Sequence, residues 1–231
     1  MDETSESTIQ QQIQQRPVQV AAGAVMLEGT LSIPANSRRI VLFAHSNSSS
    51  PDTSPDVYND MAELFHESGF ATLLVNLLTA EDEALDRETG FFRENVDVLH
   101  KRIIGAANWL LENRETENLR IGYFGAGVAG AAVLMAAAER PDAVVAVVSC
   151  AGRTDLAEPY LSRVIAPTLF IVGENDSQAV DRNRKALESL TVDKRLETIG
   201  GVTNLFEKSE TLREVARLAC GWFERYIPVS G

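Results

Sequence analysis

The chain of 231 residues lacks the sequence features that identify several classes of protein. It contains only two cysteines, Cys150 and Cys220, which argues against a disulfide framework or a cysteine-based metal site. No apolar run reaches the ~18 residues typical of a membrane-spanning helix. Residues 1–17 are acidic and glutamine-rich, and they lack the basic start and apolar centre of a signal peptide. We therefore expect a cytoplasmic protein without a membrane partner.

Positive charge is also scarce. The chain has 21 Lys and Arg against 33 Asp and Glu, so its net charge is −12 and its pI is about 4.7. This balance disfavours nucleic acid and anionic membranes as partners. The length suits one α/β domain with a large core. We expect a flexible N-terminal arm over residues 1–15 and a single domain over residues 16–231.

Apolar segments alternate with amphipathic ones from about residue 39 to the end. The patterns predict strands at about 17–22, 25–32, 38–45, 70–78, 119–125, 143–150, 167–173 and 194–201. They predict helices over 56–69, 94–113, 128–140, 178–190 and 209–227, and an acidic surface excursion over 79–92. The alternation indicates an α/β fold: a mainly parallel, doubly wound sheet of about eight strands with helices on both faces.

Ligands in such sheets bind beyond the carboxyl ends of the strands. The candidate site residues are therefore those that directly follow strands. They are His45 and Ser46, the turn from Gly125 to Val128, Cys150, Asp176 and the loop around Asn204. The same turn contains a Gly-x-Gly-x-x-Gly pattern, but no acidic residue ends a following strand about 20 residues on, so nucleotide binding is not expected. No spacing of His, Asp or Glu suggests a metal, and no cofactor is expected.

The stretches "RIGYFGAGVAGAAVLMAAAERPDAVVAVVS", "APTLFIVGENDSQAV" and "GGVTNLFEKSETLREVARLACGWF" resemble the dienelactone hydrolase-like branch of the α/β-hydrolases. The resemblance runs from about residue 17 to 228 and implies the α/β-hydrolase fold. It places the nucleophilic serine at Gly127, the triad acid at Asp176 and the general base at Asn204. Glycine and asparagine supply neither a nucleophile nor a base, so the family's Ser-His-Asp mechanism is not expected to operate.

The altered positions suggest an engineered or rebuilt hydrolase. In this hypothesis Cys150 attacks an activated small-molecule ester and His45 removes the thiol proton, since a Cys-His pair is a working nucleophile and base. Glu94 would orient His45. Ser46, Gly127, Val128 and Asn204 would form the oxyanion pocket at a helix N-terminus.

Other interpretations stay open. Cys150 at a strand end is often a small buried apolar residue, and Glu94 also suits a solvated charge at a helix start. The chain is alternatively an inactive hydrolase fold that binds a ligand or partner in the former pocket, or a deliberately inactivated hydrolase. Substrate identity and oligomeric state do not follow from the sequence.

Overall fold

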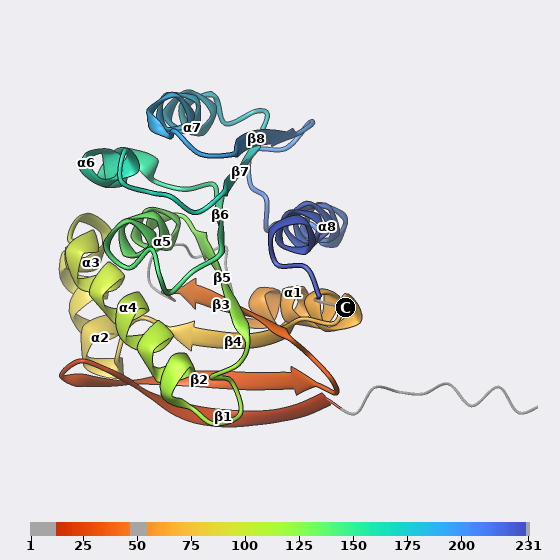
Figure 1. Cartoon of the computed structure of the whole chain (residues 1–231). Helices are drawn as coiled ribbons and strands as arrows, with labels where there is room; N and C mark the ends of the chain where they lie inside the picture. Colours follow the sequence, from red (N-terminus) through yellow and green to blue (C-terminus); the bar gives the residue numbers. More distant parts are fainter. Residues whose placement is uncertain (1–12, 47–54, 230–231) are drawn as a thin grey trace, which may run out of the picture.

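The computed structural model describes residues 13–46 and 55–229, and its eight strands form one sheet in the order β1-β2-β4-β3-β5-β6-β7-β8 (Figure 1). The strands are β1 (Ile13–Ala22), β2 (Val25–Pro34), β3 (Arg39–His45), β4 (Ala71–Asn76), β5 (Arg120–Ala126), β6 (Ala146–Cys150), β7 (Thr168–Gly173) and β8 (Lys194–Ile199). β2 runs antiparallel to β1 and β4, and the remaining pairs are parallel. The expected sheet is confirmed.

Helices cover both faces of this sheet. They are α1 (Pro55–Glu67), α2 (Ala80–Thr89), α3 (Phe91–Glu94), α4 (Val96–Glu112), α5 (Val128–Glu139), the 3₁₀ helix η1 (Thr154–Ala157), α6 (Glu158–Leu161), α7 (Ser177–Ser189) and α8 (Ser209–Tyr226). Figure 1 shows α1 and α8 on one side of the sheet and α4, α5, α6 and α7 on the other. The central strands are therefore enclosed by helices on both faces.

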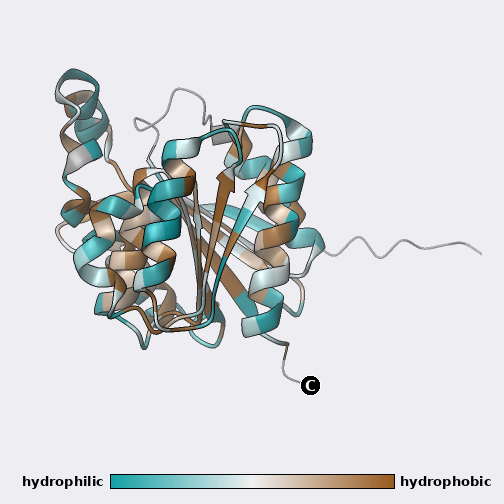
Figure 2. Ribbon diagram, turned by 90° about the horizontal axis from the view of Figure 1, so that it is seen from above, coloured by the Kyte–Doolittle hydropathy of each residue, from teal (hydrophilic) through white to brown (hydrophobic). Residues whose placement is uncertain are grey.

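The core divides into two apolar clusters, one on each face. Phe43, Phe65, Phe124 and Phe223 belong to the cluster beneath α1 and α8, whereas the larger cluster lies beneath α4 and α5. Every residue of β3, β6 and β7 is buried. Figure 2 shows these apolar strands between helices whose outer surfaces are hydrophilic. Burial on both faces explains why the strands read as continuous apolar runs.

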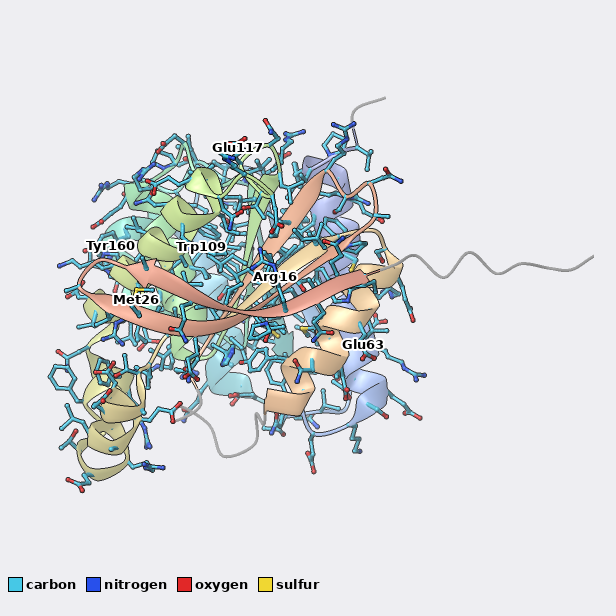
Figure 3. All side chains as sticks on the ribbon, turned by 90° about the horizontal axis from the view of Figure 1, so that it is seen from below. Arg16, Met26, Glu63, Trp109, Glu117 and Tyr160 are labelled. Atoms are coloured by element: carbon cyan, nitrogen blue, oxygen red, sulfur yellow. The ribbon has the colours of Figure 1, made fainter. Side chains whose placement is uncertain are left out.

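The β1–β2 hairpin is longer than the sequence predicts. Ile13 pairs with Pro34 at its open end, and Figure 3 shows the hairpin crossing one end of the molecule with Met26 at its tip. Arg16 of β1 also forms an ion pair with Glu115. The expected arm over 1–15 is therefore wrong for residues 13–15, because β2 extends far enough to pair with them. Residues 1–12 lie outside the described part of the chain.

The expected excursion over 79–92 is a helix rather than a loop for most of its length. Thr79 and Asp82 form a capping box at the start of α2, in which the Asp82 N–H donates to Thr79 Oγ1 at 3.2 Å and the Thr79 N–H donates to Asp82 Oδ2 at 3.0 Å. Arg102 of α4 donates to Asp82 Oδ2 and to the Leu77 carbonyl, both at 2.6 Å. These bonds attach α2 to the end of β4.

His66 makes the stability of the fold depend on pH. Its side chain lies near the end of α1 and shares a hydrogen bond of 2.8 Å with Thr72 Oγ1 on β4. Burial lowers the pKa of His66 to about 4, below the value of about 6.5 expected in the unfolded chain. Between these values the unfolded state binds more protons. The contribution of His66 to the free energy of unfolding is therefore complete above about pH 6.5 and is lost as the pH falls toward 4.

We expect His66→Gln to reduce this pH dependence, because glutamine keeps a hydrogen-bonding group but does not titrate. Urea unfolding at about pH 7 and about pH 4.5 measures the loss of unfolding free energy in each protein. The wild type should lose more between the two conditions than the variant. Equal losses would show that His66 is not held neutral in the native state.

Candidate functional site

The candidate site lies where β3, β5 and β6 end. Ala44 of β3 pairs with Gly125 of β5, and Ala126 of β5 pairs with Cys150 of β6. His45 and Cys150 therefore occur at the same level, with one strand between them. Because neighbouring strands are about 4.8 Å apart, their backbones are separated by roughly 10 Å. The structure thus confirms the strand order on which the expected pairing of these residues rests.

The turn after β5 has the form of a nucleophile turn. Gly127 has φ 56° and ψ −122°, a conformation that residues with side chains rarely adopt. Its N–H donates to the Cys150 carbonyl at 3.0 Å, and its own carbonyl accepts from the Gly130 N–H at 3.1 Å and the Arg153 N–H at 3.0 Å. Three hydrogen bonds therefore hold this residue between β5, β6 and α5, in a conformation that suits glycine.

Among the described residues, nothing fills the space in front of Gly127. A Cβ placed on Gly127 would meet no atom of residues 13–46 and 55–229 within 4 Å. By contrast, a Cβ on Gly125 would lie 2.5 Å from the Ala129 carbonyl oxygen, so the approach of β5 to α5 requires a glycine there. The turn thus keeps the shape that presents a side chain, without the side chain itself.

Helix α5 begins directly after this turn, at Val128. The first N–H groups of a helix have no acceptor within it and carry part of the positive end of the helix dipole. The side chain of Val128 is buried in the core beneath α4 and α5, so the residue offers its backbone to a ligand. An oxyanion or carboxylate in front of Gly127 would therefore be stabilised by this helix end.

Cys150 lies at the expected strand end, but its surroundings are those of a core residue. Its exposed fraction is 0%, and it belongs to the apolar cluster beneath α1 and α8, against which Ala126 also packs. Burial raises the pKa of the Cys150 thiol far above its usual range. Because the thiolate is the reactive form of cysteine, this environment disfavours nucleophilic attack.

His45 stacks on Tyr58 of α1 with ring centroids 4.7 Å apart and an interplanar angle of 22°. Tyr58 is buried, and burial followed by the nearby Cys150 raises the pKa of its hydroxyl. Tyr58 is thus the aromatic neighbour of both residues, and the sequence analysis missed it. The available signal was its spacing to Met61 and Phe65 on the buried side of α1.

Asp176 and Asn204 each stabilise their own loop. Asp176 is the N-cap of α7, where its carboxylate accepts from the Ala179 N–H at 2.9 Å. The Asn204 Oδ1 accepts from the Phe206 N–H at 2.9 Å. The two loops are joined by the Asn175 N–H, which donates to the Val202 carbonyl at 3.0 Å. Both predicted remnant positions therefore have a structural role.

The remaining expected residues are placed only in part. Ser46 follows β3 directly and is half-buried, but the loop after it, residues 47–54, lies outside the described residues. Glu94 is the last residue of α3 rather than the start of the long helix, and its side chain belongs to the part that is not described. Its proposed contact with His45 stays a prediction.

Neither metal nor membrane features stand out in the described residues. Over residues 13–46 and 55–229, no three side chains of His, Cys, Asp or Glu gather closely enough to hold a metal ion. Within the same ranges, no helix combines the length and apolar character that crossing a bilayer would need.

Comparisons with known proteins agree with the architecture. The model of the dienelactone hydrolase family matches residues 28–209. A dienelactone hydrolase from Anabaena variabilis is 46% identical, with a TM-score of 0.87 over 93% of this chain and 99% of its own. A carboxyl esterase from the fungus Tuber melanosporum is 15% identical, with a TM-score of 0.70 over 93% of this chain and 87% of its own. The α/β-hydrolase fold is confirmed.

Two curated proteins from Mycobacterium tuberculosis, strains CDC 1551 / Oshkosh and H37Rv, carry a provisional phosphoribosyl transferase name. Each is 42% identical over 206 residues, which is 89% of this chain but 45% of the relative. The chain therefore spans less than half the length of these relatives. An engineered origin finds no support in these comparisons.

The burial of both cysteines leads to a test of thiol reactivity. Burial also raises the pKa of Cys220, to about 12. We expect the native protein at neutral pH to react slowly with an aromatic disulfide reagent that releases a coloured thiol. The chain unfolded in guanidinium should release two equivalents, one for each cysteine. Rapid release of one equivalent by the native protein, abolished in Cys150→Ala, would contradict the inertness of Cys150.

Proposed function

Because the chain belongs to the dienelactone hydrolase family of α/β-hydrolase-fold hydrolases and esterases, we propose that it binds small esters or carboxylic acids at the Gly127 turn without forming a covalent intermediate. One observation carries this proposal. Gly127 keeps the positive-φ backbone of a nucleophile turn, and no described residue fills the space that a nucleophile would occupy. A carbonyl or carboxylate group fits this space with its oxygen toward the start of α5.

A cavity beside His45 supports small-molecule binding. It has a volume of about 450 Å³, and its lining includes His45, Tyr58, Asn59 and Asn76. Pockets of a few hundred cubic ångströms with a few polar groups are typical of small-ligand sites. In the proposed complex the acyl group lies at Gly127, and the remainder of the ligand extends past His45 toward this cavity.

A second candidate is thiol hydrolysis. His45 and Cys150 end strands that flank β5, and Tyr58 neighbours both. In this reaction the Cys150 sulfur attacks the ester carbonyl while His45, oriented by Glu94, takes the thiol proton. The C–O bond breaks, the alcohol leaves with that proton, and water then hydrolyses the thioester to release the acid and restore the thiol. The Val128 N–H and Asn204 stabilise the oxyanion, while Ser46 and Gly127 shape the pocket. The burial and raised pKa of Cys150 make this candidate weaker than binding without a covalent intermediate.

An ester assay separates the two candidates. The protein is mixed with p-nitrophenyl butyrate, and the reaction is quenched in acid. Mass spectrometry then measures the masses of the intact protein and of its peptides. Binding without covalent chemistry predicts no burst of nitrophenol and no acyl group on Cys150. Nitrophenol should then be released equally slowly by the wild type and by Cys150→Ala. An acyl group on Cys150, absent in Cys150→Ala and formed more slowly in His45→Ala, would establish the thiol mechanism instead.

Binding itself is measured by calorimetric titration with butyrate and with the amide analogue of the ester. Gly127→Leu fills the open space and should abolish binding. Gly23→Leu is the matched control, because Gly23 also has a positive φ, of 69°, and open space around its Cβ position. It lies in the β1–β2 turn and should leave binding unchanged. Equal binding by wild type and Gly127→Leu, or none by the wild type, would refute the proposed site.

Restoring the missing groups should create hydrolysis. We expect Gly127→Ser with Asn204→His to raise the kcat/KM for p-nitrophenyl butyrate by roughly two orders of magnitude, because a nucleophile and base then join the retained turn. Gly23→Ser with Asn204→His carries similar backbone strain of about 1–3 kcal/mol and should show no gain. Equal rates in the two folded double variants would indicate that the turn no longer supports catalysis.

A further inference from the structure

A second cavity lies between the η1–α6 segment and α7, away from the Gly127 turn. Its volume is about 260 Å³, which is roughly that of nine water molecules. Figure 1 shows α6 and α7 on the side of the sheet opposite α1 and α8. None of the candidate site residues lines it. The cavity therefore suits a ligand with about nine non-hydrogen atoms, one for each water molecule that would otherwise fill it.

Two polar side chains of the cavity wall have buried atoms without hydrogen bonds. Thr154 is 1% exposed, and its Oγ1 bonds to no other group in the described ranges. The Nε of Arg182 also makes no hydrogen bond to a described residue, although it forms an ion pair with Asp155. Buried polar groups are usually hydrogen-bonded, because leaving them without a partner is costly. These two atoms indicate that a polar molecule completes the cavity.

The charges around the cavity have opposite signs. Asp155 is held by Arg153, whose Nε and Nη2 approach it at 3.0 and 2.9 Å, while the Arg182 Nε lies 3.6 Å from it. Glu158 and Lys185 also line the cavity, and neither is in an ion pair with another described residue. Asp155 thus pairs with both Arg153 and Arg182, so Glu158 and Lys185 are the carboxylate and the cation of the cavity that have no ion pair among the described residues, and Arg182 is shared with Asp155.

The rest of the wall consists of two buried apolar side chains and the exposed Ser189. Leu161 of α6 is 1% exposed and Ala186 of α7 is 3% exposed, and both line the cavity. A ligand that fits must therefore carry a negative group, a positive group and a small apolar part. Few small metabolites combine the three features at this size, and free α-amino acids do.

We propose that this cavity binds a free α-amino acid with an aliphatic side chain. The carboxylate of the ligand contacts Arg182 and Lys185 and accepts a hydrogen bond from the Thr154 hydroxyl. Its ammonium group contacts Glu158. Its side chain lies against Leu161 and Ala186. An Arg guanidinium that retains a free donor is well suited to a carboxylate.

The test uses the full chain and three matched compounds. Leucine, 4-methylpentanoate, which lacks the ammonium group, and isopentylamine, which lacks the carboxylate, are titrated by calorimetry and thermal unfolding. Leucine should bind saturably and raise the melting temperature, since a ligand of the native state stabilises it. Each analogue should bind at least tenfold more weakly. No saturable binding of leucine up to about 10 mM, or equal binding of 4-methylpentanoate, would overturn the proposal.

Variants locate the site. Arg182→Gln and Glu158→Gln should each weaken leucine binding by tenfold or more. Arg184→Gln is the control on the same helix, since Arg184 is exposed and pairs with Asp181 instead of lining the cavity; it should bind as the wild type does. If Arg182→Gln fails to fold, Lys185→Gln takes its place with the same expectation. Unchanged binding in both cavity variants would place leucine elsewhere and refute the assignment.

Discussion

The hydrogen bond from the Gly127 N–H to the Cys150 carbonyl is the contact on which the site geometry depends. It fixes the end of β5 against the end of β6 at the residue where the chain turns into α5. The Arg153 N–H, which donates to the Gly127 carbonyl, binds the loop after β6 to the same residue. Glycine adopts this positive-φ conformation at little steric cost, and these bonds hold it there without any side chain at position 127.

The same contact explains why Cys150 is a poor nucleophile in spite of its position. Its carbonyl holds the turn, so its backbone cannot move outward without releasing Gly127. Its thiol remains beneath α1 and α8, where burial favours the neutral form. Asp176 is similarly committed to α7 as its N-cap. The site therefore places the positive end of α5, which stabilises an acyl oxygen, beside a thiol that burial keeps neutral.

The sequence predicts the sheet and the edge at which the site lies, because both follow from local patterns. Alternating apolar and amphipathic segments specify parallel strands, and parallel strands bring their carboxyl ends together. The burial of Cys150 could not be read in this way, since it depends on Tyr58 and α8, which are distant in the sequence. The start of β1 was missed for a related reason. Ile13 is exposed and Gln14 and Gln15 are polar, so no buried pattern marks them, and pairing with β2 is what orders them.

The cavity at η1 and α7 is physically connected to the Gly127 turn. The Asn183 Nδ2 donates to the Gly152 carbonyl at 3.2 Å and to the Ala179 carbonyl at 2.9 Å, so α7 holds the loop that follows β6. Arg153 in that loop binds both Gly127 and Asp155. A ligand beside Asp155 would thus lie two residues from Arg153, whose N–H donates to the Gly127 carbonyl. Any coupling between the two sites must be reciprocal, and this short, hydrogen-bonded loop is the element through which it would pass.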